Sequence, residues 1–307
     1  MGRYILGHIV QAVFTMWIVV TLVFGLVRLA GSPVDILAGE LASREQVEAL
    51  KQRFGLDKPL HVQYGMYLWG ILRGDFGESV ITREPAMAEV LQRSWASVQL
   101  GAVAMVFTLA MALPIGVYAA VYRGRRLDRL ASAFGILGQA VPPFWLGILL
   151  IWLFAGQLRW LPAAGKSGPA SFVMPVIVIS WYAVAGIMRL TRSTMLDVLD
   201  SEYIKLARIK GLPEHSVIWK HGLKNAAIPV ITYGALIFVG LFLVGSVVAE
   251  TIFTWPGVGR LIILQSVRFR DFPVVQAAVI FICFLYVTVN LFVDILYSYL
   301  DPRIRRA

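Results

Sequence analysis

The chain has 307 residues, of which 58% are hydrophobic and only 15% are charged, a balance that excludes an ordinary soluble domain. Its formal net charge is +10, but the basic residues stand between long apolar runs instead of gathering on one soluble surface, so nucleic acid is not an expected partner. The single cysteine, Cys283, excludes an internal disulfide and a multi-cysteine metal site. We therefore expect a membrane protein without a metal centre.

Uncharged runs predict the transmembrane helices. Six runs have at least 19 residues each. At a rise of 1.5 Å per residue such a run reaches about 28 Å, close to the hydrocarbon thickness of a bilayer. The first run is too long for the apolar region of a signal peptide and predicts a retained helix. The sequence thus predicts an all-α membrane protein with six transmembrane helices, at 9–27, 94–122, 130–158, 167–188, 225–249 and 272–293.

The distribution of basic residues predicts the orientation of these helices. Segments 1–8, 123–129, 189–224 and 295–307 would lie on one side, and they hold 15 of the 28 Lys and Arg residues but six of the 18 acidic residues. Short loops rich in Lys and Arg remain in the cytoplasm. Both chain termini are therefore expected on the cytoplasmic side.

Segment 31–93 would then form a small folded element on the outer face. A short amphipathic helix is expected to begin at a Ser43 cap and to end at Gly55. A second helix follows, in which Tyr64 and Tyr67 belong to an apolar pattern at helical spacing, typical of a helix lying on the membrane. The alternative is a lid that packs on the bundle and meets no partner.

The most polar interruption of the later chain, residues 189–229, predicts two short helices. The first has Asp200 or Ser201 as its cap and Gly211 as its stop. The second begins at Pro213 and continues toward Pro229. Two rigid helices could transmit force from a partner, whereas a flexible basic loop would bind only lipid headgroups. The first helix offers an apolar face with cations beside it, formed by Tyr203, Ile204, Ala207, Lys205, Arg208 and Lys210.

A break is expected within the third apolar run. Pro142 and Pro143 remove backbone donors at mid-depth, and Gln139 is a polar residue beside them. Broken helices in membranes line a cavity or pack against other helices. These three residues are therefore candidates for lining a solute pathway, with packing alone as the alternative.

The chain contains no recognisable source of energy. Gly165, Lys166 and Ser167 resemble the end of a phosphate-binding loop, but Trp160 stands where that loop needs a glycine. The four histidines are scattered without metal-ligand spacing, and no catalytic triad pattern is present. The apolar runs also lack almost all ionisable groups that ion coupling would need. Catalysis by this chain is not expected, and work would have to come from another subunit.

Several stretches resemble the permease subunits of binding-protein-dependent ABC importers, in the peptide/nickel branch. They are EYIKLARIKGL followed by HGLKNAAIPVIT in the polar interruption, FGLDKPLHVQY and GDFGESV in the outer segment, ETIFTWPGVGRL after the fifth run, and NLFVDILYSYLDPRIR near the end. The resemblance covers nearly the whole chain. It implies a type I importer transmembrane domain in which the first short helix of the interruption couples the permease to an ATPase.

On this resemblance the chain divides into a first transmembrane helix (1–30), an outer segment (31–93), a five-helix transmembrane domain (94–300) that contains the coupling loop (189–226), and a tail (301–307). Ala207 and Gly211 match the family loop, while Lys205 and Leu206 stand where the family has Glu and Ala. The residues that the resemblance assigns to ATPase coupling are Glu202, Tyr203, Ile204, Lys205, Ala207, Lys210 and Gly211.

The resemblance also implies partners and a location. We expect a second homologous permease subunit, two ATPase subunits that carry ATP and Mg²⁺, a solute-binding protein and the lipids of a bacterial inner membrane. The chain itself would hold no cofactor. The solute would be a peptide or a similar small molecule, with glutathione, nickel chelates, opines and sugars as open alternatives. Two other readings are a secondary carrier or channel that works alone, and a membrane scaffold that moves no solute.

Overall fold

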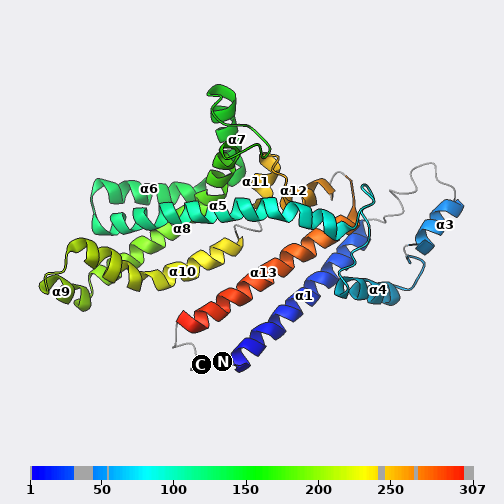
Figure 1. Cartoon of the computed structure of the whole chain (residues 1–307), viewed down its shortest axis with the longest axis horizontal. Coiled ribbons are helices and arrows are strands. Elements are labelled where there is room, and N and C mark those ends of the chain that lie inside the picture. The colour runs from blue at the N-terminus through cyan, green and yellow to red at the C-terminus, as the bar shows by residue number, and fades with distance from the viewer. Residues whose placement is uncertain (1, 31–43, 54, 241–245, 266–268, 301–307) are drawn as a thin grey trace. The chain divides into compact units, whose positions relative to one another are not determined.

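The computed structural model describes residues 2–30, 44–53, 55–240, 246–265 and 269–300 (Figure 1). Within these ranges the regular structure is helical apart from one isolated β-bridge between Glu78 and Pro85. The chain divides into two compact units. Unit 1 comprises Met1–Ala96 and Pro256–Ile295, and unit 2 comprises Ser97–Trp255 together with the end of the last helix from Leu296.

Unit 1 is built around the first and last long helices. The helices are α1 (Gly2–Ala30), α3 (Arg44–Arg53), α4 (Leu60–Leu72), the first residues of α5 (Ala86–Val121), α12 (Val258–Ile263) and α13 (Phe272–Leu300). Small and branched side chains of α5, α12 and α13 form its main core, which is made of Ala86, Val90, Val258, Leu261, Val274, Ala277 and Ala278.

The outer segment is attached to α1 by polar and aromatic contacts. The Tyr64 hydroxyl lies 2.7 Å from the Thr21 hydroxyl. The Arg28 guanidinium donates to the Gln63 side-chain oxygen at 2.6 Å, and the Phe24 ring contacts Tyr64 edge-on. Both helices expected in this segment are present, as α3 and α4, although Ser43 lies outside the described residues. The position of α4 on the membrane surface remains a prediction.

Unit 2 holds the polar interruption and the helices that carry it. After α5 come α6 (Arg126–Ala140), α7 (Pro143–Leu150) and the π-helix η1 (Ile151–Gln157). The long helix α8 then packs against α6 and α10 (Figure 1). The remaining elements are α8 (Ala170–Leu199), α9 (Glu202–Ile209), the π-helix η2 (Ser216–Gly222), α10 (Leu223–Gly240) and α11 (Ser246–Ile252).

In the part of the chain that the structure describes, four helices are long and apolar enough to cross a bilayer, namely α1 from Leu6, α5, α8 and α13 to Phe292. A fifth crossing is possible if α6 and the helix from Pro143 to Gln157 form one broken span. The fifth predicted run is covered by α10 and α11, but residues 241–245 between them lie outside the described residues. The multi-pass helical architecture is therefore confirmed, while the count of six and the orientation remain predictions.

Helix α8 is longer than its apolar run predicts. It continues past Met188 to Leu199, so the first part of the expected coupling loop is helical. A paired charge lies in this extension. The Arg192 guanidinium bonds both oxygens of the Asp128 carboxylate on α6, at 2.5 and 2.9 Å, and Asp128 also accepts the Gly124 backbone N–H. A bidentate pair of this kind neutralises a carboxylate that is only 7% exposed.

We expect Arg192→Met to destabilise the protein because it leaves the buried Asp128 carboxylate without its partner. Breaking a buried pair by removing one member costs about 3 to 5 kcal/mol, and we expect the lower end because the Arg192 side chain is 30% exposed. Thermal unfolding of the purified membrane complex measures the loss. The double variant Asp128→Leu/Arg192→Met is the control, and it should recover much of the lost stability. Equal melting of the single and double variants would contradict this account.

Candidate coupling site

Helix α9 ends as its sequence predicts. Gly211 has a φ of +78°, the left-handed conformation that glycine adopts without strain. Its N–H donates to the Arg208 carbonyl at 2.9 Å, and the Leu212 N–H donates to the Ala207 carbonyl at 3.3 Å. This pair of bonds is a Schellman motif, which satisfies the last carbonyls of the helix. The predicted stop at Gly211 is confirmed.

The N-terminus of α9 differs from the prediction in one detail. Ser201 occupies the N-cap position with an extended backbone, but its side chain makes no capping hydrogen bond. The hydroxyl donates instead to the Val198 carbonyl at 2.5 Å, at the end of α8. Ser201 therefore ties the turn between α8 and α9 to the preceding helix.

Helix α9 is held firmly against the rest of unit 2. Ile204 is fully buried and Ala207 nearly so, and both pack against Val217 of η2. The Arg208 guanidinium also forms an ion pair with Glu214 at 2.8 Å, which joins α9 to the start of the next helix. This hydrogen bond raises the pKa of Arg208 above its ordinary value. We call α9 with its turn to η2, residues 201–217, the knob.

The exposed apolar face of α9 is not the face that the sequence predicted. Tyr203 is 42% exposed, Leu206 56% and Ile209 81%, and these residues recur every third position along the helix. Ile204 and Ala207, which were expected to meet a partner, instead face inward and support the knob. Leu206 and Ile209 were missed as contact candidates. Their spacing from Tyr203 was the available signal, but an eight-residue helix with two apolar faces does not reveal which one is buried.

The charged candidates lie beside this exposed face. Glu202 and Lys205 form an exposed ion pair of 2.7 Å one turn apart. Such a surface pair contributes little to stability. Lys210 is exposed at the C-cap of α9. All three side chains are exposed and therefore accessible to another protein.

The predicted break near Pro142 is present. Helix α6 ends at Ala140, α7 starts with Pro143 at its first position, and the two axes differ by 103°. Pro142 and Pro143 are exposed and Gln139 is half-buried. The sequence predicted a break but not so sharp a bend. The role of these residues in a solute pathway remains a prediction.

Besides Asp128, three further acids are buried among the described residues, and the sequence did not reveal their burial because they lie near the margins of the apolar runs. Glu250 is fully buried in unit 2 and accepts the Ser97 hydroxyl at 2.6 Å. In unit 1, Asp271 accepts the Ser79 hydroxyl at 2.5 Å, and Glu89 lies close to Thr82. Each carboxylate thus has a nearby hydroxyl donor, whereas the Asp271 Oδ1 atom is buried without a hydrogen-bond partner among the described residues.

Gly211→Val should weaken the knob, since a non-glycine residue in the left-handed region costs about 1 to 2 kcal/mol. A Cβ at this position would meet no heavy atom within 4 Å, so the cost is conformational and not steric. Gly211→Asn is the matched variant because asparagine tolerates this conformation better. When the amounts of assembled complex are equal, ATP-driven uptake should be lower in the Gly211→Val variant than in the Gly211→Asn variant. Equal uptake by the two variants would show that the conformation of Gly211 is unimportant.

Comparison with known proteins identifies the family. Residues 112–306 match the family described as binding-protein-dependent transport system inner membrane component, and residues 1–115 match the description of its N-terminal part. The chain belongs to this family. It is a permease subunit of an ABC importer of the peptide/nickel branch, and its place is the inner membrane of a bacterium.

Curated relatives match the chain along its full length. The glutathione transport system permease protein GsiC of Salmonella paratyphi A is 40% identical over 307 residues, which cover 99% of each chain. The protein of the same name from Escherichia coli strain K12 is 38% identical over 306 residues, with 99% of each chain covered. The resemblance inferred from the sequence motifs is confirmed.

Solved structures share the fold of the permease. A chain from inward-facing MetNI, a methionine ABC transporter, is 16% identical, with a TM-score of 0.60 over 70% of this permease and 97% of that chain. A chain from an amino acid ABC transporter with histidines is 17% identical, with a TM-score of 0.53 over 69% of this permease and 94% of that chain. At these identities the likeness concerns the fold alone.

Proposed function

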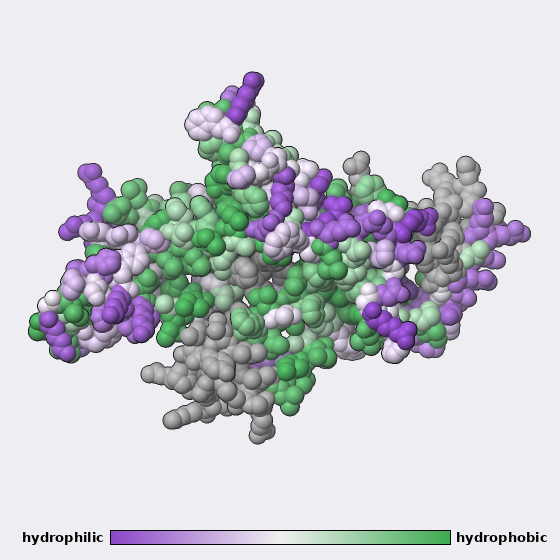
Figure 2. Space-filling view, in the orientation of Figure 1, coloured by the Kyte–Doolittle hydropathy of each residue, from purple (hydrophilic) through white to green (hydrophobic). Residues whose placement is uncertain are grey.

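We propose that this permease imports a peptide-like solute and that the knob receives the force of ATP binding from an ATPase subunit. The observation that carries the proposal is the exposed apolar face of Tyr203, Leu206 and Ile209 on a helix whose opposite face is locked into unit 2. An exposed apolar surface rimmed by charged residues is typical of a protein contact. Figure 2 shows hydrophilic residues around α9 and hydrophobic residues over much of α6.

The partners follow from the family. A solute-binding protein delivers the solute, two ATPase subunits supply energy, and a second homologous permease subunit completes the pathway. ATP and Mg²⁺ bind to the ATPase subunits, and this chain performs no catalysis. With the predicted six transmembrane helices and both termini in the cytoplasm, the knob would lie on the side of the membrane where ATP is available.

Coupling requires that motion of α9 reaches the membrane helices. ATP binding draws the ATPase subunits together and moves the docked knobs with them. The knob cannot slide freely, because Ile204 is buried against η2 and Arg208 is paired with Glu214. Helix η2 continues directly into α10, and the turn before α9 continues from α8. Displacement of the knob would therefore tilt α8 and α10 together.

Glutathione or another short peptide is the proposed class of solute, on the basis of the relatives' names. Gln139, Pro142 and Pro143 are the proposed pathway residues, since a sharply broken helix exposes backbone groups that can line a polar path. Substitution of Gln139 by leucine should then alter the range of imported solutes. Unchanged uptake and unchanged range would remove these residues from the pathway.

Reconstitution of the complex in liposomes tests the function. Uptake of labelled glutathione should require the solute-binding protein, the ATPase subunits and ATP at once. Uptake by the permease without ATPase subunits would instead favour a carrier or channel. No flux of any tested peptide with all partners present would favour a scaffold.

A further inference from the structure

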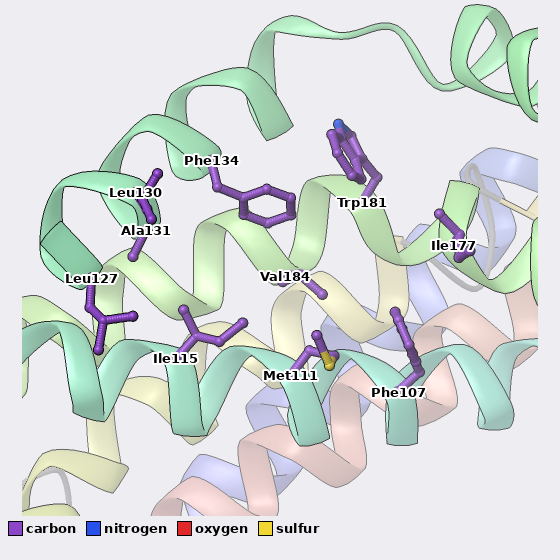
Figure 3. A pocket seen from close by; sticks show the side chains of 10 residues that line it. All are labelled: Phe107, Met111, Ile115, Leu127, Leu130, Ala131, Phe134, Ile177, Trp181 and Val184. Atoms are coloured by element: carbon purple, nitrogen blue, oxygen red, sulfur yellow. The ribbon is translucent and has the colours of Figure 1, made fainter.

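An apolar groove of about 430 Å³ lies within unit 2 between α5, α6 and α8 (Figure 3). Side chains from all three helices point into it, and every residue that lines it is apolar or aromatic. Its length along α5, from Phe107 to Ile115, corresponds to about 12 Å at the rise of an α-helix. The residues that define it best are Phe107, Met111, Ile115, Leu127, Leu130 and Trp181.

Exposed arginines flank two of the groove residues on the first turns of α6. Leu127 and Leu130 line the groove on the first turns of α6, and Arg126 and Arg129 stand beside them in the sequence and are exposed. Among the described residues, neither arginine makes an ion pair. Arg125 is also exposed, and its guanidinium carbon lies 5.5 Å from the centroid of the Tyr122 ring.

The acidic groups nearby do not cancel this positive charge. Asp128 is bound on both oxygens by Arg192 and is therefore already compensated. Arg123 has Asp200 at 4.0 Å, an exposed pair that is weakly held. The first turn of α6 adds its unpaired N–H groups and the positive end of the helix dipole. The α6 side of the groove is thus suited to an anionic oxygen group.

We propose that this groove binds the acyl chain of an anionic phospholipid whose phosphate is held by Arg126 and Arg129. The Trp181 indole N–H is the one side-chain donor among the residues that line the groove, too few for the polar backbone of a peptide, so the groove is unsuited to the transported solute. A purely apolar partner helix would leave these arginines without a counter-charge. An anionic phospholipid fits both features: its acyl chain fits the apolar groove, and its phosphate supplies the counter-charge for the arginines. Basic residues at the ends of membrane helices attract such anionic headgroups.

Quenching of Trp181 fluorescence tests the site in the intact importer complex. The complex is placed in nanodiscs that contain phosphatidylglycerol or phosphatidylcholine with brominated acyl chains, which quench a tryptophan on contact. The difference between the parent complex and Trp181→Phe isolates the emission of Trp181. Quenching should need about tenfold less brominated phosphatidylglycerol than brominated phosphatidylcholine.

A variant without the two arginines distinguishes specific binding of an anionic headgroup from non-specific contact with lipid. Arg126→Gln/Arg129→Gln should abolish the preference for phosphatidylglycerol, whereas Arg44→Gln on α3, an exposed arginine in the outer segment, should keep it. ATPase activity of each variant confirms that the complex has assembled. Equal quenching by the two lipids in the parent complex would overturn the proposal. An unchanged preference in the double variant, or no quenching by either lipid because a protein helix fills the groove, would overturn it as well.

Discussion

Leu206→Asp/Ile209→Asp should abolish ATP-driven uptake while leaving the permease folded and inserted. Both side chains are exposed in the isolated chain, so a carboxylate there remains hydrated and costs the fold little. In a docked complex the same carboxylates would be buried in an apolar contact. Loss of a central apolar anchor typically costs about 2 kcal/mol or more, which is about a thirtyfold loss of affinity.

The measurement is ATPase stimulation by solute and binding protein, together with the amount of ATPase subunit that co-purifies. Arg44→Asp/Lys51→Asp on α3 is the control, because it also places two carboxylates at exposed helix positions but leaves the knob unchanged. The control should keep most of the coupling. Full coupling in the double aspartate variant would mean that the ATPase contacts another surface.

Gly116→Val should prevent accumulation of the permease. A Cβ at Gly116 would lie 2.7 Å from the Met188 carbonyl oxygen and 2.7 Å from the Thr191 Cβ, closer than real contacts allow. The carbonyl belongs to the backbone of α8 and cannot move aside, so α5 and α8 would have to separate. Overpacking of a tight core costs about 1 to 3 kcal/mol and sometimes more, and we expect the upper part of this range.

Gly25→Val on α1 provides the control for this substitution, because a Cβ there meets no atom within 4 Å. The two variants make the same chemical change in a long apolar helix, so they differ mainly in packing. Membrane levels and the melting temperature of the purified complex should fall for Gly116→Val and stay close to the parent for Gly25→Val. Equal levels of the two variants would contradict the close approach of α5 and α8.

Local features of the fold could be predicted from the sequence because they depend on neighbouring residues. Gly211 ends α9 through its own conformation, and the two successive prolines Pro142 and Pro143 remove neighbouring backbone donors between α6 and α7. The length of an apolar run similarly predicts α1 and α13. These signals act within a few residues, and no tertiary contact needs to be known.

Features that depend on distant residues could not be predicted. Helix α8 extends to Leu199, and its Arg192 pairs with Asp128, which lies in a different helix. The buried face of α9 is decided by Val217, which follows a turn. The π-helical geometry of η1 and η2 has no comparable sequence signal. For the candidate site, the sequence predicted helix α9 and its stop, but it placed Ile204 on the contact face, whereas Ile204 faces inward.

Site-specific cross-linking from Ile209 tests the central claim most directly. A photoreactive amino acid replaces Ile209 in the assembled importer, and the same amino acid replaces Leu72 at the end of α4 as a control of comparable exposure. We predict that Ile209 cross-links to an ATPase subunit and that Leu72 does not. An assembled complex with working ATPase subunits and no cross-link from Ile209 would contradict the role of the knob.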